Sequence, residues 1–268
     1  VCDIALKGDV ISTNINCNGD STGSITTNIT GGREPYIYTW NTGDTTPFLN
    51  NLPIGTYILT VTDTLNQVFT DTIDIVQPLP LTASILANDV SCNGLSDGQM
   101  NVNTTGGNGG YSFLWNTNDT TTTINNLDIG NYNVLITDAL GCTDTASAMI
   151  SEPTILAANI NSVSHVTCNG NATGSTSVLA TGGNTSYNYL WNNGDTTNST
   201  NNLNAGNYIV TVTDNKGCQD VVNIAITDSH GPTSGGSGSI VNPFNWALNL
   251  APIYHNLMLC LSLYCLKH

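Results

Sequence analysis

The sequence predicts an all-β protein built as a tandem array of three small β-sandwich modules. The motif Cys-Asn-Gly begins at Cys17, Cys92 and Cys168, at intervals of 75 and 76 residues. Between turn residues, apolar and polar side chains alternate over short segments, as in half-buried β-strands. A fixed period of this length indicates one small domain per repeat. Other positions that recur with the motif are Trp40, Trp115 and Trp191; Gly55, Gly130 and Gly206; Tyr57, Tyr132 and Tyr208; and Asp63, Asp138 and Asp214.

The second module shows the expected strands most clearly. Tyr132, Val134 and Ile136 alternate with polar residues, and the other segments follow the same period of two. The repeats have no competing helical periodicity. The strands that we expect in this module cover residues 99–104, 111–115, 120–124, 131–137 and 143–150.

Turn residues refine the fold class. Asp138 and Asp214 each stand three residues before a glycine, which is typical of a type I turn that closes a hairpin. Leu127, Gly130 and Tyr132 resemble the tyrosine corner of immunoglobulin-like sandwiches, in which a Tyr hydroxyl bonds to the backbone a few residues upstream. We therefore expect immunoglobulin-like β-sandwich modules. The corner recurs at Leu52, Gly55 and Tyr57 and at Leu203, Gly206 and Tyr208.

Prolines near residues 78–80 and 153 mark the joints between modules, since proline cannot continue a central strand. The segment 231–239 has the composition of a flexible linker. We expect an N-terminal remnant of a preceding module or linker at 1–16, repeats at 17–80, 81–155 and 156–229, a Gly/Ser linker at 230–241 and an apolar tail at 242–268.

The composition excludes some classes of partner. The formal net charge is −15, from 19 acidic and 4 basic residues, and 9% of the residues are charged. Nucleic acid needs a basic footprint, which is missing here, and anionic membrane surfaces are disfavoured for the same reason. Polar residues also interrupt the apolar tail, so we expect no membrane span. A polar, uncharged composition rich in Gly and β-branched residues is typical of exported β-proteins.

The cysteines indicate an oxidising location. Cys92 and Cys142 are 50 residues apart, and Cys168 and Cys218 repeat that spacing. Matched pairs in small tandem domains favour disulfides within each module over zinc, because the cysteines form no Cys-x-x-Cys or Cys/His cluster. The first module has Gln67 where its second cysteine would stand, so Cys17 either pairs with Cys2 or stays unpaired.

At this level of detail the pattern resembles the SprB repeat over roughly residues 17–228. The motif elements are Cys-Asn-Gly, Gly-Gly, Tyr-x-Tyr-x-Trp, Gly-Asp-Thr-Thr, Leu-x-x-Gly-x-Tyr and Val-Thr-Asp-x-x-Gly-Cys. The third copy carries them from Cys168 to Cys218, while the first has Asn66 and Gln67 in place of Gly-Cys. The resemblance implies type IX secretion, a secreted or cell-surface location, a role in gliding-type adhesion or as a stalk, and no catalytic residues.

The residues after the linker resemble the start of a C-terminal sorting domain for the same secretion system, which would make the secretion machinery a partner. Asn242, Pro243 and Phe244 open this segment. It is shorter than such domains usually are, so a truncated sorting domain, a corrupted reading frame and an interfacial segment all stay open. Cys260 and Cys265 within it are either free thiols or a local pair.

Two sets of recurring residues are candidates for binding a ligand. The three recurring tryptophans either form the cores of the modules or stack on sugars, and the alternating strand around them favours the core. Calcium is the one cofactor hypothesis, because hard cations want clustered oxygens. Against it, lone turn aspartates normally bond their own backbone. The calcium candidates are Asp63, Asp138 and Asp214, with Asp44, Asp119 and Asp195 in nearby loops.

A short motif recurs seven times along the chain. Asp followed by Ser or Thr and then Ala, Leu, Ile or Thr resembles an O-glycosylation signal of exported proteins from the same bacterial group. The acceptors that it predicts are Ser21, Thr45, Thr64, Thr72, Thr120, Thr145 and Thr196.

Catalysis has no candidate site in the sequence, because no histidine recurs beside a nucleophile and an orienting acid. The leading hypothesis is a non-catalytic adhesin or stalk segment that acts by modular display and multivalent contact with surface glycans or other cell-surface proteins. One alternative is a carbohydrate-binding or spacer region of a larger secreted enzyme. The other is a structural repeat that self-associates into a filament through edge strands.

Overall fold

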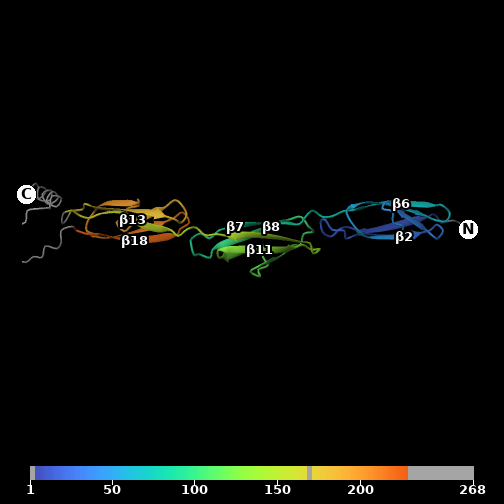
Figure 1. Ribbon diagram of the computed structural model, residues 1–268, viewed down its shortest axis with the longest axis horizontal. Helices are drawn as coiled ribbons and strands as arrows, with labels where there is room; N and C mark the ends of the chain where they lie inside the picture. Colours follow the sequence, from blue (N-terminus) through green and yellow to red (C-terminus); the bar gives the residue numbers. More distant parts are fainter. Residues whose placement is uncertain (1–3, 168–170, 229–268) are drawn as a thin grey trace, which may run out of the picture. The chain divides into compact units, whose positions relative to one another are not determined.

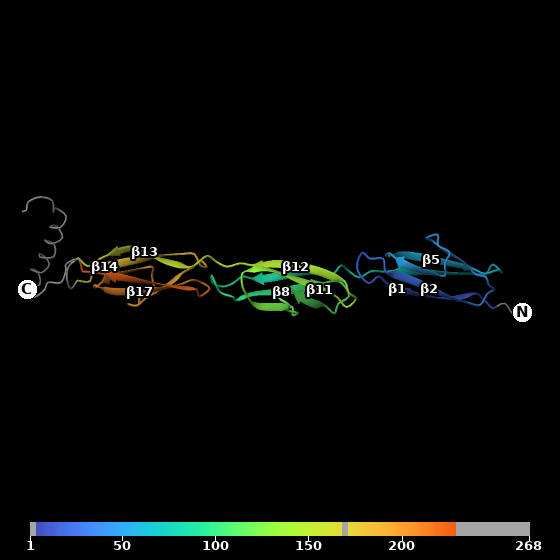
Figure 2. The same ribbon diagram turned by 60° about the horizontal axis from the view of Figure 1, so that its bottom comes forward.

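The computed structural model describes residues 4–167 and 171–228, which form eighteen β-strands and no helix. Every six consecutive strands make one module of two three-stranded antiparallel sheets (Figures 1 and 2). The density of contacts divides the chain into two compact units. Among the described residues, one unit contains those up to Asp89 with Ser96–Ser151, and the other contains Val90–Leu95 with those from Glu152 to Asp228.

The first module shows the topology that all three share. One sheet has the order β1-β2-β4, and the other has the order β3-β5-β6. The strands are β1 (Lys7–Thr13), β2 (Gly23–Thr30), β3 (Ile37–Trp40), β4 (Phe48–Leu52), β5 (Gly55–Thr62) and β6 (Val68–Ile75).

The second and third modules repeat these strands at nearly the same lengths. In the second they are β7 (Thr82–Asn88), β8 (Gly98–Thr105), β9 (Ser112–Trp115), β10 (Thr123–Leu127), β11 (Gly130–Thr137) and β12 (Thr143–Ile150). In the third they are β13 (Ala157–Ser164), β14 (Gly174–Thr181), β15 (Asn188–Trp191), β16 (Ser199–Leu203), β17 (Gly206–Thr213) and β18 (Gln219–Ile226).

The first strand of each module was missed in the sequence analysis. Residues 1–16 were expected to be a remnant of another module or a linker, but β1 pairs with β2 from Lys7↔Thr30 to Thr13↔Ser24. The first module therefore begins before Cys17. The motif Cys-Asn-Gly follows the first strand of a module and does not open it. In the second module, alternating Ala83, Ile85 and Ala87 could have signalled this strand.

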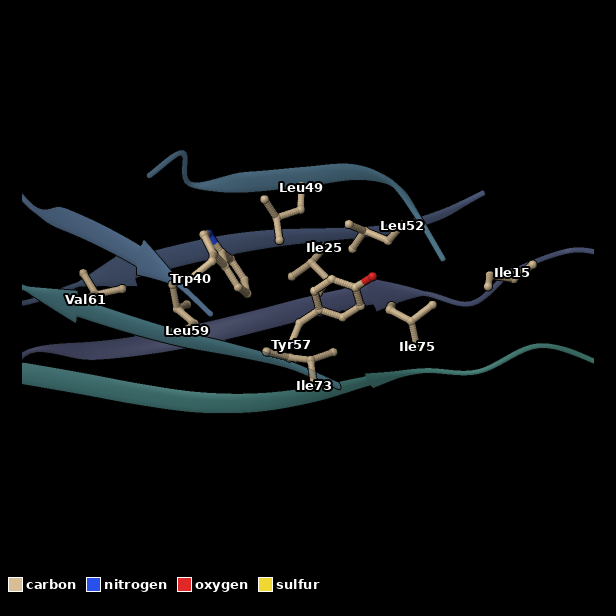
Figure 3. Packing of buried hydrophobic residues seen from close by; sticks show 10 residues of the cluster. All are labelled: Ile15, Ile25, Trp40, Leu49, Leu52, Tyr57, Leu59, Val61, Ile73 and Ile75. Carbon is tan, nitrogen blue, oxygen red and sulfur yellow. The ribbon is translucent and has the colours of Figure 1, made fainter. Parts of the chain in front are cut away.

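The core of each module lies between its two sheets. In β5, Tyr57, Leu59 and Val61 point inward with at most 6% of their surface exposed, while the residues between them face out. Ile25 of β2 packs against them from the other sheet (Figure 3). This alternation is the period of two read from the sequence, and it buries one face of each sheet.

The recurring tryptophans are core residues. Trp40, Trp115 and Trp191 are 2%, 1% and 1% exposed. Each indole Nε1 donates to a backbone carbonyl six residues later, at 2.8–2.9 Å, so the buried polar atom has a partner. This burial excludes the sugar-stacking alternative for all three indoles.

The tyrosine corner is present in all three modules. The hydroxyl of Tyr57 donates to the carbonyl of Pro53 at 2.9 Å. Tyr132 and Tyr208 make the same bond to the residue four positions upstream, at 3.1 Å. A net hydrogen bond of this kind stabilises by about 1 kcal/mol and fixes the path between the two sheets at that corner.

Replacing Trp191 with Ala should lower the free energy of unfolding of the third module by about 3–5 kcal/mol, because the change leaves a large cavity in its core. Calorimetry of the full chain should show one transition moving to lower temperature. The neighbouring Leu190, which is 60% exposed, provides the control, and Leu190→Ala should change stability by at most about 0.5 kcal/mol. Equal effects of the two substitutions would contradict the assigned core.

Candidate functional site

A buried aspartate organises the last hairpin of every module. Asp63, Asp138 and Asp214 are 3%, 5% and 2% exposed. In the second module, Oδ1 of Asp138 accepts the backbone N–H groups of Leu140 and Cys142, both at 2.9 Å. Its Oδ2 accepts the N–H of Asn108 at 2.8 Å. The carboxylate thus joins the hairpin to the loop after β8.

The Gly-Gly motif allows the carboxylate to approach that loop. The second glycine of the pair is Gly32, Gly107 or Gly183, with φ of 62°, 58° or 59°. A Cβ atom at these positions would lie 2.7–2.8 Å from the Oδ2 atom of the aspartate. The motif therefore serves the buried aspartate in two ways, since it supplies a left-handed backbone and leaves space for the carboxylate.

The hydrogen bonds decide the charge state of these groups. Burial tends to raise the pKa of Asp138, but the amides of Asn108, Cys142 and Leu140 favour the carboxylate form, and the net pKa is lowered from 3.8. Asp63 and Asp214 have their pKa lowered against the same effect of burial, by the corresponding backbone amides. All three are therefore structural carboxylates that stay ionised at neutral pH.

Calcium does not fit these carboxylates. Both oxygens of each buried aspartate already accept N–H donors, which occupy the positions that a cation would need. Among the described residues, no group of three or more His, Cys, Asp or Glu side chains is placed to hold a metal. Asp44 and Asp119 instead accept the hydroxyls of Thr42 and Thr117 at 2.6 Å, and Asp195 accepts the amide of Asn193 and the hydroxyl of Thr200.

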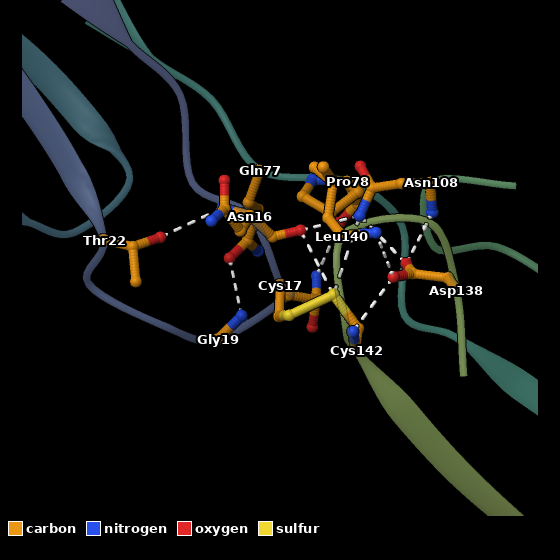
Figure 4. Close-up of a disulfide and its surroundings, with 11 residues drawn as sticks. Asn16, Cys17, Gly19, Thr22, Gln77, Pro78, Asn108, Asp138, Leu140 and Cys142 are labelled. Atoms are coloured by element: carbon orange, nitrogen blue, oxygen red, sulfur yellow. Dashed lines mark hydrogen bonds between the residues drawn. A yellow bond between two sulfur atoms is a disulfide. The ribbon is translucent and has the colours of Figure 1, made fainter. Parts of the chain in front are cut away.

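Two disulfides connect consecutive modules. Cys17 is bonded to Cys142, with Cα atoms 5.5 Å apart (Figure 4). Cys92 is bonded to Cys218, with Cα atoms 5.6 Å apart. In each case the loop after the first strand of one module is joined to the last hairpin of the next. The bonds close loops of 125 and 126 residues.

The expected pairing within modules was wrong. Cys142 is bonded to Cys17 and not to Cys92, and Cys218 is bonded to Cys92 and not to Cys168. Cys17 likewise does not pair with Cys2. Cys2, Cys168, Cys260 and Cys265 lie outside the described residues.

The length of the strands explains why cysteines 50 residues apart do not pair within a module. In the second module, Cys142 follows Thr137 and precedes Thr143, which pair at one end of β11 and β12. The other end of these strands is the pair Gly130↔Ile150, and Asp89, just before the Cys-Asn-Gly loop, accepts the N–H of Ser151 there. Eight-residue strands separate the two ends by roughly 25 Å. A disulfide needs Cα atoms within about 7 Å, so the partner must come from another module.

In the second and third modules, an asparagine links the buried aspartate to the disulfide region. Asn108 Nδ2 donates to Asp138 Oδ2 at 2.9 Å and to the carbonyl of Asn16 at 2.7 Å. Asn184 makes the equivalent bonds to Asp214 at 3.1 Å and to the carbonyl of Ser91 at 2.9 Å. Neither asparagine was predicted from the sequence, although each follows the Gly-Gly pair of its module.

The first module differs at both of these positions. Arg33 stands in the place of the asparagine, and Gln67 stands in the place of the hairpin cysteine. The side-chain oxygen of Gln67 accepts the N–H of Leu6 at 2.9 Å, so it serves its own module. The two residues that connect a module to the preceding one are therefore replaced together.

A surface hollow lies beside the Cys17–Cys142 bond. Asn18, Asp20, Pro80, Leu81 and Thr143 line it, together with Gly141 and the two cysteines. Asp20 is the single ionisable side chain in this lining, so the hollow holds no acid–base pair. Elsewhere in the chain, the ring Nδ1 of His165 accepts the backbone N–H of Thr227 at 3.1 Å, so this histidine makes a structural hydrogen bond.

The seven residues of the O-glycosylation motif are all exposed: Ser21, Thr45, Thr64, Thr72, Thr120, Thr145 and Thr196. Their modification stays a prediction. The linker at 230–241 and the tail at 242–268, with its resemblance to a sorting domain, lie outside the described residues. No described segment forms a helix of the length and hydropathy that crossing a membrane requires.

The paired antiparallel sheets and the tyrosine corners define the chain as a tandem array of immunoglobulin-like β-sandwich modules. The SprB repeat family matches residues 10–45, 86–120 and 160–196, one segment in each module. The chain therefore carries three SprB repeats. No curated protein matches it.

Several solved structures of multidomain proteins are similar at low identity. Immunoglobulin domains 1–5 of Sidekick-1 match with a TM-score of 0.42 and 10% identity, over 84% of this chain and 59% of that one. The N-terminal eight Ig domains of Down Syndrome Cell Adhesion Molecule match with a TM-score of 0.30 and 10% identity, over 85% and 36%. A structure of a 1.5-MDa bacterial ice-binding adhesin matches with a TM-score of 0.37 and 14% identity, over 84% and 98%.

The lowered pKa of the hairpin aspartate predicts a dependence of stability on pH. The stability that the Asp138 carboxylate contributes should be fully present above the ordinary pKa of 3.8. It should be lost as the pH falls through the lower pKa of the folded state. Asp138→Asn should therefore reduce stability at pH 7 and flatten the decrease in acid, as measured by urea unfolding from pH 7 to pH 2. Asn131→Ala, at an exposed position of β11, is the control and should keep the wild-type profile. An unchanged profile for Asp138→Asn would refute this role.

Peptide mapping should find the disulfides between modules. A protease that cuts before aspartate separates the relevant cysteines into the segments 9–19, 89–96, 138–143 and 214–219. Without reductant, mass spectrometry should detect 9–19 joined to 138–143 and 89–96 joined to 214–219. A linked pair of 89–96 and 138–143 would instead show pairing within the second module.

Proposed function

We propose that this chain is a non-catalytic segment of a secreted or cell-surface adhesin, exported by type IX secretion, that displays its modules for multivalent contact. Three SprB repeats in covalently connected modules carry this proposal. Disulfides persist in oxidising compartments, which supports export. The hollow and the buried carboxylates lack a nucleophile with its base, which favours contact over chemistry.

The outer face of the sheet β3-β5-β6, and of its counterparts β9-β11-β12 and β15-β17-β18, is the surface that we assign to this contact. In the second module, Leu114 lies directly opposite Leu135, and the two are 51% and 38% exposed. In the third, Leu190 lies opposite Thr211, which is itself opposite Val221, and Leu190 and Val221 are 60% and 51% exposed.

The chemistry of this face suits uncharged ligands. Thr, Ser and Asn side chains surround the exposed aliphatic residues, and charged residues are few. Such a surface can combine hydroxyl and amide hydrogen bonds with apolar contact, which fits glycans or the polar surface of another cell-surface protein. A weak contact on each module gains strength when several modules bind the same surface.

Beads coated with the full chain should adhere to cells or to a glycan array, and the double variant Leu114→Asn/Leu190→Asn should adhere several-fold less. The matched control is Leu86→Asn/Leu179→Asn, which makes the same change on the outer faces of the other sheets, where the residues are 68% and 55% exposed. Equal losses would remove the assignment to one face. A chain that adheres to no cell surface and no glycan would refute the adhesin proposal.

A further inference from the structure

We propose that the two overlapping disulfides make the chain from Cys17 to Cys218 a tether of limited length, which resists extension even when all of its modules unfold. This property goes beyond the proposed function, because it depends on how the cysteines are joined and not on any ligand. The supporting observation is the order of the four bonded cysteines along the chain. The first pairs with the third, and the second pairs with the fourth.

This order creates two covalent junctions, Cys17–Cys142 and Cys92–Cys218. Three stretches of backbone connect the first junction to the second. Residues 17 to 92 span 75 positions, residues 92 to 142 span 50, and residues 142 to 218 span 76. All three stretches connect the same two junctions covalently. The shortest of them therefore sets the maximum separation of the junctions.

The shortest stretch lies within the second module. This module gives one cysteine to the module before it and one to the module after it, and 50 residues separate the two. The longer stretches include most of the first and third modules. Once tension has unfolded all three stretches, the 50-residue stretch becomes taut first, and the other two remain slack because they hold 75 and 76 residues.

The disulfides greatly reduce the maximum extension of the chain. A fully extended chain spans at most about 3.3–3.6 Å per residue, so the 50-residue stretch reaches roughly 170 Å. Without disulfides, the 201 residues from Cys17 to Cys218 would reach roughly 690 Å on the same scale. The bonds therefore reduce the extension of this part of the chain about fourfold.

Pairing within modules would act differently. Bonds from Cys92 to Cys142 and from Cys168 to Cys218 would remove two separate loops and leave 101 residues free to extend. The overlapping arrangement is thus the shorter tether, although it contains the same number of bonds. Loss of either bond alone lengthens the shortest path by nearly the same amount, from 50 residues to 75 or 76.

Single-molecule stretching of the full chain, held at its two ends, tests this inference. Oxidised wild type should extend over 50 residues between Cys17 and Cys218, in addition to the flanking segments. The paired variant Cys17→Ser/Cys142→Ser should extend over 75 residues, and Cys92→Ser/Cys218→Ser should extend over 76. Reduced wild type should extend over all 201, which adds roughly 500 Å to the oxidised length.

The final length of a stretched chain depends on its covalent bonds and not on its fold, so loss of stability in a variant does not confuse the result. The flanking segments are the same in every variant and cancel in the comparison. An oxidised length that matches 101 residues, or one that reduction leaves unchanged, would overturn the proposal. The adhesion assay is independent of this outcome, since a chain can be a limited tether without binding, and can bind without being one.

Discussion

The small size of each module is the constraint on which the structure depends. A domain of about 75 residues buries only about 60% of the surface that its unfolded chain exposes, which leaves its core marginal. Two features stabilise each module: one buried indole between its two short sheets, and a tyrosine whose hydrogen bond fixes the corner. The disulfides add a constraint from outside the core. A closed loop of about 100 residues stabilises by roughly 4.7 kcal/mol in the chain-entropy model, and the loops here are of that size.

The features inside a module were largely predictable from its sequence. Alternating residues such as Tyr132, Val134 and Ile136 gave the strands, and the spacing of Gly130 and Tyr132 gave the corner, because these depend on local geometry. The buried tryptophans followed from the same alternation. The first strand was missed because its apolar positions hold small residues such as Ala83 and Ala87, which give a weak signal.

The disulfide partners were not predictable in the same way. The spacing of 50 residues is equal in two modules whether each cysteine bonds within its module or across to the next, so periodicity cannot separate the two arrangements. The separation of the strand ends does decide between them, and it requires a three-dimensional structure. The joint replacement at Arg33 and Gln67 was the one available hint, since both positions face the preceding module in the other repeats.

The buried aspartate shows how one residue can serve two levels of structure. Within its module it satisfies the amides of a tight hairpin and holds the loop that contains the Gly-Gly pair. Through Asn108 or Asn184 it also orients an amide toward the carbonyl next to the disulfide. The same hairpin turn therefore closes the last two strands of its module and positions its cysteine for the disulfide to the preceding module.

The overlap of the two disulfides also bears on the survival of the protein outside the cell, where proteases are common. Hydrolysis of any one peptide bond between Cys17 and Cys218 leaves both products covalently attached. Two cuts in different stretches do the same, and two cuts within one stretch release only the piece between them. To detach one end of the protein from the other, proteases must cut all three stretches, so a nicked chain can keep its attachment long after it is first cleaved.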